Sequence, residues 1–582
     1  MKFLLTAVNA KYIHSNLAVY SLASYAGKRL RQRGKAELAP DIEIAEYTIN
    51  QPMGKILTDI YKRQPDVLLL SCYIWNRKEI EELVTDMGKI RDDLDIWLGG
   101  PEVSFDSEEA LGLLPDAKGV IRGEGEETFC RIVESYGRGG ITDELLSEID
   151  GITFRRDSGE ITVNPERRPL NLSDVPFPYE TLEAFDNRII YYESSRGCPF
   201  RCSYCLSSVE KTMRFRSMEL VKGELEYFIR QRVPQVKFID RTFNCSHSHA
   251  MEIWRFLKEH DNGITNFHFE IAGDILKDEE LELISGLRPG QIQLEIGVQS
   301  TNERTLREIN RPMDFRALSR AVDILKSGNN VHLHLDLIAG LPFEDYGSFK
   351  KSFDDVFSLR PEQLQLGFLK VLKGSPMEKR RHRYGLKYTG LPPYEVLETN
   401  WISYDELIRL KSVEEMVEVY YNSGQFKNTI ELLLKGFESP FVFFEELAAW
   451  YEEHKLVMLN FSRNQRYERL LCFGEELMGK ENSGPLHEAM TFDYYLRENA
   501  KNRPDFFGCD SVEKEFAKSF YSREAREHRY LTGGRCDTDD PRLLRKLTHL
   551  EKLGDTYYLF DYTRRNPMDN NARVVKLDGC TA

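Results

Sequence analysis

The chain has 582 residues, a formal net charge of −15 and 41% hydrophobic residues. This length exceeds what one hydrophobic core supports, so we expect two to four domains. The acidic balance excludes a surface that attracts nucleic acid as a whole, and no apolar run approaches the roughly 20 residues of a membrane span. The apolar run within residues 1–10 predicts a buried strand rather than a signal peptide, so the expected location is cytoplasmic.

Residues 1–137 alternate short apolar runs with amphipathic stretches such as Leu17–Leu30 and Lys78–Ile90. The apolar runs have the length of buried strands, and the amphipathic stretches have helical spacing. This alternation predicts a doubly wound, Rossmann-like parallel sheet of the α/β class, whose ligands bind in the loops after the strands. The predicted strands are Phe3–Val8, Ile42–Tyr47, Val67–Cys72, Ile96–Leu98 and Gly119–Ile121.

Residues 138–188 change in character and are predicted to link two domains. Gly151–Val163 has the pattern of a β-hairpin with Asp-Ser-Gly at its turn. Val175–Pro178 reads Val-Pro-Phe-Pro, and each proline keeps the residue before it extended. The first domain is therefore expected to end at residue 137, followed by a linker that contains a hairpin.

A second alternating series runs from residue 189 to residue 384. Its six strand-and-helix units predict a (β/α)6 partial TIM barrel, in which functional groups lie at the carboxyl ends of the strands. Helices are expected at Met218–Arg230 and Phe315–Lys326, among others. The predicted strands are Ile189–Glu193, Val236–Asp240, Phe267–Ile271, Ile292–Val298, Val331–Ile338 and Gln363–Lys370.

The C-terminal region, residues 385–582, is predicted to be mainly helical, because the strand-and-helix rhythm stops there. Its first expected helix is Tyr394–Leu410, and strand-like runs occur at Tyr557–Tyr562 and Arg573–Leu577. A basic run, Lys379–Lys387, lies at its boundary with the barrel. Such a run is more often a solvated face than a nucleic-acid contact, so RNA binding is the less favoured interpretation.

Cys198, Cys202 and Cys205 form a C-x3-C-x2-C triplet directly after the first predicted barrel strand. Ten cysteines placed at random over 582 residues would almost never give such a cluster. Zinc is the alternative metal, but zinc sites usually have four ligands and C-x2-C pairs. No fourth Cys or His follows the triplet before Cys245 and His247. Three thiolates instead suit a 4Fe–4S cluster whose fourth iron is open.

The triplet and the predicted strands around it resemble the radical SAM superfamily over residues 189–371. In that superfamily the open iron chelates the amino and carboxylate groups of S-adenosylmethionine (SAM), so the resemblance implies that Cys198, Cys202 and Cys205 hold the cluster. Relatives bind SAM through an aromatic residue and through polar residues at strand ends, although such residues also cap helices or satisfy loop amides. The implied SAM contacts are Tyr204, Asp240, Glu270, Glu295, Gln299 and Asp336.

Two features of the predicted barrel leave alternatives open. Asp240 departs from the superfamily, which usually has a glycine–glycine–glutamate sequence at that position. His332 and His334 flank Leu333 on the fifth strand, so both side chains point to one face. That face is either the barrel interior or the side covered by helices.

Three loops of the N-terminal region follow predicted strands at the same sheet edge: 71–76, 99–102 and 122–126. The second and third contain a glycine pair or Gly-Glu sequences, which let the backbone approach a large flat or phosphorylated ligand. Each motif alone also serves as an ordinary turn. Together, and before a radical SAM barrel, they resemble the cobalamin-binding domain of the cobalamin-dependent radical SAM class. The implied cobalamin contacts are Ser71, Tyr73, Trp75, Asn76, Gly99, Gly100, Pro101, Glu102, Gly123, Glu124, Gly125 and Glu126.

The resemblance implies base-off cobalamin without a histidine ligand to cobalt. The Asp-x-His-x-x-Gly motif is absent, and His14 is predicted to be a hydrogen-bonding residue of a loop. Trp75 or Asn76 would then face the lower side of the corrin. The alternative is a domain that keeps this fold without the cofactor.

The order of the regions resembles a group of bacterial proteins with a cobalamin-binding domain, a radical SAM barrel and a helical domain of their own. The resemblance implies an enzyme that cleaves SAM to a 5′-deoxyadenosyl radical and transfers a methyl group from methylcobalamin to a substrate carbon. A flavodoxin or ferredoxin is the implied reductant. Cyclisation, rearrangement or sulfur insertion, with tRNA among the substrates, is the enzymatic alternative, and a non-enzymatic cobalamin or redox sensor is the other.

Overall fold

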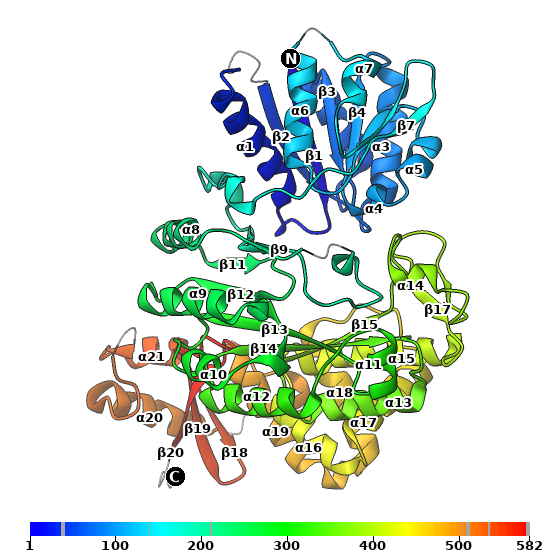
Figure 1. Ribbon diagram of the computed structural model, residues 1–582. Helices are drawn as coiled ribbons and strands as arrows, with labels where there is room; N and C mark the ends of the chain where they lie inside the picture. Colours follow the sequence, from blue (N-terminus) through cyan, green and yellow to red (C-terminus); the bar gives the residue numbers. More distant parts are fainter. Residues whose placement is uncertain are drawn as a thin grey trace.

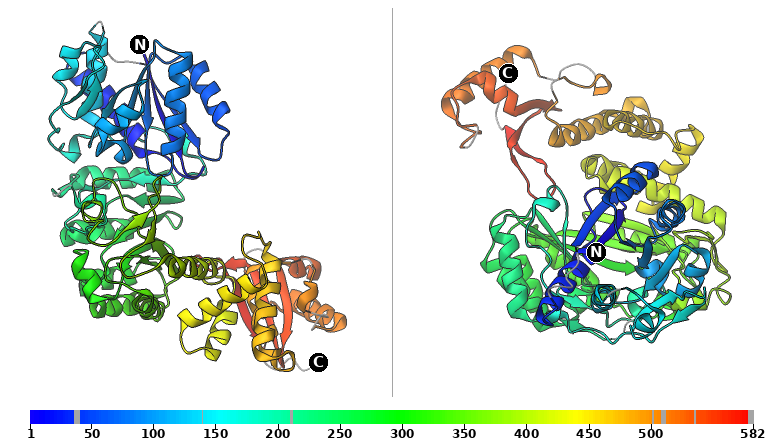
Figure 2. Two further views of the ribbon diagram at one scale, coloured as in Figure 1. Left: turned by 90° about the vertical axis from the view of Figure 1, so that its right-hand side faces the viewer. Right: turned by 90° about the horizontal axis from the view of Figure 1, so that it is seen from above.

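The computed structural model describes residues 1–35, 41–138, 140–209, 212–500, 502–507, 512–533 and 536–577. Figure 1 shows the N-terminal sheet with its helices above the barrel, and the C-terminal helices and small sheet in the lower part of the view. Turned by 90° in Figure 2, the C-terminal region projects to one side. None of the helices in the described ranges combines the length and apolar character needed to cross a bilayer.

The N-terminal sheet contains five parallel strands, as the sequence predicts. In spatial order they are β2 (Asp41–Thr48), β1 (Lys2–Asn9), β3 (Val67–Ser71), β4 (Asp95–Gly99) and β5 (Ala117–Ile121). Nearly every residue of β1 and β3 is buried, because helices cover both faces of the sheet. The carboxyl ends of all five strands meet at one edge, where the loops can form a ligand site.

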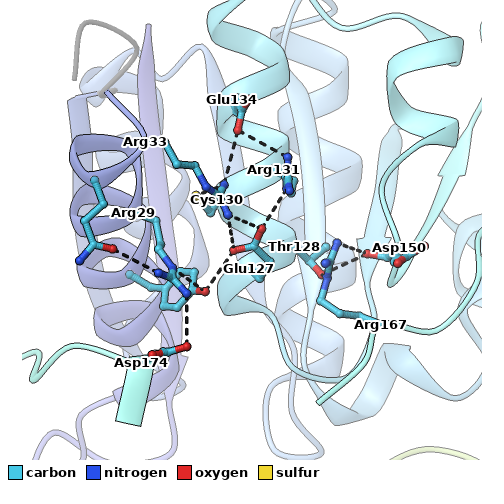
Figure 3. Close-up of polar contacts among 12 residues, drawn as sticks. Arg29, Arg33, Glu127, Thr128, Cys130, Arg131, Glu134, Asp150, Arg167 and Asp174 are labelled. Atoms are coloured by element: carbon cyan, nitrogen blue, oxygen red, sulfur yellow. Dashed lines mark hydrogen bonds and ion pairs between the residues drawn. The ribbon is translucent and has the colours of Figure 1, made fainter. Parts of the chain in front are cut away.

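Helices cover both faces of this sheet. One face carries α1 (Leu17–Gln32) and α6 (Glu126–Gly137), and the other carries α2 (Met53–Arg63), α3 (Arg77–Ile90) and α5 (Ser107–Leu113). A polar network joins α1 to α6, as Figure 3 shows. Arg33, directly after α1, donates to Glu127 of α6 at 2.8 Å, and Arg131 donates to the same carboxylate at 2.9 Å. The network fixes two helices that lie about a hundred residues apart in sequence.

The predicted hairpin is present, but it extends the first sheet instead of standing free in a linker. β6 (Ile152–Arg155) pairs antiparallel with β5, and β7 (Ile161–Val163) pairs with β6. Ile152 and Phe154 are fully buried, so the hairpin covers the edge of the parallel sheet. The alternation of residues within the segment predicts a hairpin. Which strand the hairpin pairs with depends on contacts between residues that are distant in sequence.

Six parallel strands form the open barrel that the sequence predicts. In spatial order they are β8 (Ile190–Tyr192), β11 (Gln235–Phe238), β12 (Asn266–Ile271), β13 (Ile292–Gln299), β14 (His332–Ala339) and β15 (Gln363–Phe368). β8 and β15 are the two edges, so the sheet does not close on itself. All six carboxyl ends lie at one rim, which is where such barrels carry their functional groups.

Alternate residues divide the barrel strands into an apolar outer face and a polar inner face. On β13, Leu294 and Ile296 are buried, whereas Glu295 between them is partly exposed. The outer side chains pack in one large core with α8 (Met218–Arg230), α9 (His247–Glu259), α10 (Asp278–Ser285), α12 (Phe315–Gly328) and α13 (Tyr346–Phe357). The inner face is therefore free to carry charged groups.

The C-terminal region is mainly helical, as predicted, and ends in a three-stranded antiparallel sheet. Its elements are α15 (Tyr404–Met416), α16 (Lys427–Leu433), α17 (Pro440–Glu453), α18 (Arg463–Met478), α19 (Gly484–Arg497), α20 (Lys514–Glu527), α21 (Pro541–Leu547), β18 (Thr548–Leu553), β19 (Thr556–Arg565) and β20 (Ala572–Leu577). β19 and β20 match the two predicted strands. β18 was not predicted, because its apolar residues are interrupted by charged ones.

The predicted helix Tyr394–Leu410 is wrong in its first half. Val396–Glu398 forms β17, which pairs antiparallel with β16 (Lys387–Tyr388), and the helix begins only after Ser403. The Ser403 hydroxyl accepts from the Glu406 amide at 3.3 Å, and the Glu406 carboxylate accepts from the Ser403 amide at 2.8 Å. This capping box sets the start of the helix, and its Ser-x-x-Glu signature is visible in the sequence.

Candidate functional site

Cys198, Cys202 and Cys205 lie in the loop that leaves β8, at the carboxyl rim of the barrel. Gly197 starts this loop with a φ of 102°, and a Cβ at that position would lie 2.5 Å from the Thr212 carbonyl oxygen. Only glycine accepts this conformation and this close approach. The tight turn at Gly197 is what carries the chain from the strand into the cysteine loop.

Two backbone hydrogen bonds anchor the middle of the cysteine loop. The Ser203 amide donates to the Ile309 carbonyl at 2.8 Å, and the Ser203 carbonyl accepts from the Met377 amide at 2.8 Å. Ser203 is fully buried and Cys202 beside it is 5% exposed. Segments from two other parts of the barrel thus hold the loop in place.

The three cysteines line one cavity, whose empty volume is about 720 Å³ including the part open to solvent. Five of the six predicted SAM contacts line the same cavity: Tyr204, Glu270, Glu295, Gln299 and Asp336. Strand register brings the acids together, since Glu270 lies opposite Glu295, and Asp336 lies opposite Gly297 on the next strand. The cavity therefore unites the cysteine loop with the ends of three adjacent strands.

Glu295 is the centre of the charged inner face. Its carboxylate lies 3.0 Å from Lys237 Nζ and 3.0 Å from His268 Nε2. Burial alone would raise the pKa of Glu295, but His268 and Lys237 lower it to about 2, so the group is ionised at neutral pH. His334 Nε2 lies 2.9 Å from Asp336 Oδ1, which places His334 on the barrel interior, one of the two orientations that the sequence allowed.

Glu270 and Asp336 flank Glu295 in this wall. Burial raises the pKa of both carboxyl groups, and the charge of Glu295 raises it further, although nearby cationic groups act in the opposite direction. A bound cationic ligand would favour the ionised form of both groups. The wall is therefore suited to an ammonium or sulfonium group.

Two arginines that sequence reasoning missed also line the cavity. Arg311 Nη1 lies 3.9 Å from Cys202 Sγ, and Arg311 Nη2 donates to the Gly297 carbonyl at 2.5 Å. Arg241 follows β11 at the same rim. A guanidinium group can bind a carboxylate, so both suit the acidic end of an amino-acid ligand. Arg311 belongs to no local motif, and only the position of Arg241 just after a strand could have indicated it.

Asp240 corrects the sequence prediction. It does not line the cavity but is fully buried, where it accepts from the Ser194 amide at 3.0 Å and from the Ser194 and Ser195 hydroxyls at 2.6 Å each. Burial raises the pKa of Asp240 to about 7 despite these hydrogen bonds. Its carboxyl group braces the segment that leads into the cysteine loop and does not face a ligand.

The residues around the cavity fit an iron–sulfur cluster that binds SAM. Among the described residues that line the cavity, there is no other Cys and no His, so the three thiolates are the soft ligands that this cavity offers to an iron–sulfur cluster. A structural zinc ion would require a fourth ligand. The carboxylates and arginines of the wall complement the two charged ends of an amino acid.

The first N-terminal loop presents one aromatic pair at the edge of its sheet. Tyr73 and Trp75 stack with ring centroids 4.4 Å apart and planes 12° apart, and Trp75 is 41% exposed. Asn76 is 1% exposed, and its amide donates to the carbonyls of Val8 and Ser71 at 2.9 Å each. Of the two residues predicted to face the corrin, Trp75 is accessible, whereas Asn76 is used inside the loop.

The second loop, Gly99–Glu102, packs against the first. Gly100 has a φ of 112°, and a Cβ there would lie 2.4 Å from the Cys72 carbonyl oxygen, so glycine is required for packing. Pro101 is the first residue of a short helix. Glu102 is 7% exposed and accepts a hydrogen bond from Tyr394, which lies beyond the barrel.

The third loop, Gly123–Glu126, binds the barrel directly. Glu124 forms an ion pair with Arg214, and Glu126 lies 2.7 Å from Arg196. Arg196 stands two residues before Cys198, and Glu126 is 5% exposed. These acids were predicted to contact cobalamin, but the structure engages them in fixing the N-terminal loops over the cysteine rim.

The ion pairs of Glu124 with Arg214 and of Glu126 with Arg196 show that the two rims face each other. The N-terminal rim also offers surface that suits a large planar ligand. Trp75 offers an accessible flat surface, and a Cβ at Gly123 would meet nothing within 4 Å. His14 Nδ1 lies 2.6 Å from Tyr191 Oη, as expected of a loop hydrogen-bonding residue.

Three family models match successive parts of the chain. They are the B12 binding domain over residues 4–133, the radical SAM superfamily over residues 192–356, and a protein family of unknown function, DUF4080, over residues 382–575. The first match implies cobalamin, and the second implies a 4Fe–4S cluster and SAM. The matched ranges follow the three regions of the fold.

Curated relatives are similar at low identity. The cobalamin-dependent radical SAM methyltransferase TokK of Streptomyces tokunonensis is 24% identical over 410 residues, which is 64% of this chain and 59% of that protein. The anaerobic magnesium-protoporphyrin IX monomethyl ester cyclase of Rubrivivax gelatinosus is 23% identical over 275 residues, 46% of this chain and 49% of that protein. The chain spans 59–62% of the length of the first three curated relatives that it matches.

Solved structures share the fold. The cobalamin-dependent SAM radical enzyme OxsB with aqua-cobalamin bound gives a TM-score of 0.57 at 17% identity, and covers 94% of this chain and 78% of its own. The radical SAM methyltransferase TsrM from Kitasatospora setae, with cobalamin and a 4Fe–4S cluster bound, gives 0.54 at 17% identity, with 68% and 79% covered. At this identity the likeness extends to the architecture alone.

Proposed function

We propose that this chain, which matches a B12 binding domain, the radical SAM superfamily and DUF4080 in that order, is a cobalamin-dependent methyltransferase acting on a substrate carbon. One observation carries this proposal. The cavity lined by Cys198, Cys202 and Cys205 lies at the barrel rim that the third loop of the B12-binding domain contacts through Arg196 and Arg214. A substrate held between the rims would reach both cofactors.

When bound, the cluster and SAM supply hydrogen-atom abstraction and cobalamin supplies the methyl group. In our proposal the three cysteines hold the cluster and Tyr204 lies beside the adenine. Glu270 and Asp336 receive the amino and ribose groups of SAM, because both are acidic, line the cavity and stand at strand ends. Gln299 and Glu295 complete this wall.

The remaining polar groups position the ligands and close the site. Lys237 and His268 keep Glu295 ionised, so the wall stays anionic at neutral pH. Arg311 is placed to receive the carboxylate of SAM, next to Cys202. The ion pairs of Glu124 and Glu126 hold the N-terminal loops over the rim, which limits access of water to the reacting groups.

The test uses anaerobically reconstituted protein with both cofactors and methyl-labelled SAM. We expect 5′-deoxyadenosine to form and the label to appear on cobalamin. When a substrate is identified, the label should also appear on a carbon of the product. The variant Cys202→Ala should form no 5′-deoxyadenosine, because it lacks one cluster ligand. Cobalamin that never acquires label, in a protein that still cleaves SAM, would contradict methyl transfer.

A cyclisation is the second candidate, favoured by the similarity to the magnesium-protoporphyrin IX monomethyl ester cyclase. It uses the same cavity and cofactors but transfers no methyl group from SAM. The labelling experiment separates the two, because a cyclase forms 5′-deoxyadenosine without label in its product. For either reaction we propose a flavodoxin- or ferredoxin-type protein as the source of the electron.

A further inference from the structure

The short helix that leads into the basic run contacts the cysteine loop. Met377, in the short helix α14 (Pro376–Lys379), donates its amide to the carbonyl of Ser203, the residue after Cys202. The run Lys379–Lys387 continues directly from this helix. Figure 1 shows α14 and β17 together at one side of the barrel. One backbone hydrogen bond thus joins α14, the helix that leads into the basic run, to the cysteine loop.

The charges of this region are available to a partner. Within the described residues, Arg201, Lys379 and Arg380 are exposed and make no ion pair. Arg383 pairs with Glu308 at 3.0 Å, but its side chain stays 61% exposed. No Asp or Glu occurs from residue 379 to residue 394. We call these residues the basic surface: Arg201, Lys379, Arg380, Arg381 and Arg383.

We propose that the basic surface is the docking site of a small acidic electron-transfer protein, which delivers the electron that the proposed radical SAM reaction consumes. One electron leaves the reduced donor, which is thereby oxidised, and is accepted at the centre that Cys198, Cys202 and Cys205 hold. No bond forms or breaks in this transfer. The inference rests on the proposed function, since only a redox centre at the cysteines needs such a donor.

Charge selects this class of partner. The chain carries a net charge of −15, so an acidic protein is repelled by the molecule as a whole and is attracted only where cations gather. The basic surface offers that attraction next to the helix that contacts the cysteine loop. One apolar side chain could also be buried on docking: Val209, close after Cys205, is 44% exposed.

An RNA is the competing occupant, and the surface favours it less. Binding to a nucleic-acid backbone generally draws on many phosphate contacts, whereas this patch has five cations on an acidic protein. The one aromatic residue of the run up to Lys387, Tyr384, is fully buried and donates to Glu308 at 2.6 Å. It offers no base a surface for stacking.

The experiment measures 5′-deoxyadenosine formation by the reconstituted holoenzyme with two electron sources, reduced flavodoxin and dithionite. The double variant Lys379→Glu/Arg380→Glu should lower the flavodoxin-supported rate about tenfold or more at low salt, because steering and docking are lost. The dithionite-supported rate should stay within about twofold, because a small reductant needs no docking surface. Raising the salt should slow the wild type toward the variant.

A matched control has the same change in charge at another exposed place. Lys514→Glu/Lys518→Glu, on α20, should leave both rates unchanged. Equal loss of both rates in the test variant, or equal flavodoxin-supported rates in the test and control variants, would overturn the docking site. So would loss of binding to bulk tRNA in the test variant with no change in the flavodoxin-supported rate. Failure of the wild type to cleave SAM with dithionite would instead sink the proposed function.

Discussion

Two rims of parallel strands face each other in this protein, and they use their polar residues differently. The barrel rim gathers its acids, Glu270, Glu295 and Asp336, into the cavity that the cysteines line. The rim of the N-terminal sheet engages Glu124 and Glu126 in ion pairs with the barrel instead. One rim is built to hold a ligand with side-chain charge, and the other to attach a domain and offer backbone and aromatic surface.

The difference shows that a motif after a strand predicts where a residue lies more reliably than it predicts which group that residue binds. Strand alternation correctly placed both sets of acids at carboxyl rims. Whether a carboxylate binds a ligand or pairs with an arginine depends on which side chains of the facing domain lie next to it. Arg196 and Arg214, which decide the matter for the third loop, lie 70 to 90 residues away in sequence.

The largest expected effect is loss of the metal centre. Cys202→Ala should abolish SAM cleavage and the iron–sulfur absorbance of anaerobically reconstituted protein, because the cluster loses one of three ligands. The control Cys472→Ala, in α18 of the C-terminal region, should retain both. A fully active Cys202→Ala protein would contradict the claim that the barrel rim holds the centre that cleaves SAM.

The next effect concerns SAM binding at the barrel rim. Asp336→Asn should weaken SAM binding about 10- to 100-fold, because a hydrogen bond to a charged group contributes about 1.5–3 kcal/mol. Equilibrium binding of SAM to the reconstituted protein measures this change. Asp323→Asn, at an exposed position of α12, is the matched control and should bind SAM normally. Unchanged affinity in Asp336→Asn would assign this acid to a structural role.

At the opposite rim, the aromatic pair should matter for cobalamin. Trp75→Ala should weaken cobalamin binding about tenfold through lost apolar contact, whereas Trp75→Phe should retain most of it. Corrin content after reconstitution and gel filtration reports the result. Because Trp75 is 41% exposed, thermal stability should hardly change. Normal corrin content in Trp75→Ala would place the cofactor elsewhere on the rim.

The two acids of the third loop should affect stability more than cobalamin binding. Glu124→Gln/Glu126→Gln removes the two negative charges that pair with Arg214 and Arg196. All four side chains are largely buried at the domain contact. We expect the free energy of unfolding to fall by about 1–3 kcal/mol in urea titrations. Corrin content measured on the folded protein should be maintained. A loss of corrin without a loss of stability would restore their assignment as ligand contacts.

A further effect is a pH dependence of stability at the barrel rim. Glu344 is 1% exposed, accepts from Ser300 at 2.6 Å and Ser352 at 2.9 Å, and burial raises its pKa from 4.5 to about 7. The pKa of Glu344 is higher in the folded protein than in the unfolded chain. Its contribution to the free energy of unfolding is therefore complete below about pH 4.5 and is lost as the pH rises through about 7.

Wild-type protein should therefore lose stability relative to Glu344→Gln between about pH 5 and pH 8, by at most about 3 kcal/mol. Urea midpoints of both proteins at the two pH values provide the measurement. Gln keeps an oxygen to accept from the two serines, so the comparison isolates the charge. Parallel curves for the two proteins would show that Glu344 stays neutral, or stays ionised, throughout this range.

Much of the architecture was predictable, because it follows from short-range patterns. Period-two and helical spacing predicted both sheets, and the cysteine triplet indicated the loop that lines the cavity. Five of the six implied SAM contacts line the cavity, since alternation puts Glu270, Glu295 and Asp336 on one face. Asp240 was misassigned because a serine pair just ahead of the cysteine loop captures its carboxylate.

What the sequence did not reveal depends on contacts between distant segments. Arg311 reaches the cavity through its hydrogen bond to Gly297, which no local motif signals. The hairpin at 152–163 pairs with β5, and the short helix that ends at Lys379 contacts the cysteine loop because Met377 binds Ser203. Each of these facts joins parts of the chain that become neighbours only in the folded protein.

The most direct test of the account is the metal and corrin content of the anaerobically purified and reconstituted protein. We predict about four iron and four sulfide ions with one corrin per chain, and loss of the iron and sulfide when the three cysteines are replaced by alanine. Zinc bound at the cysteines, or wild-type protein that takes up neither iron nor corrin, would contradict the account.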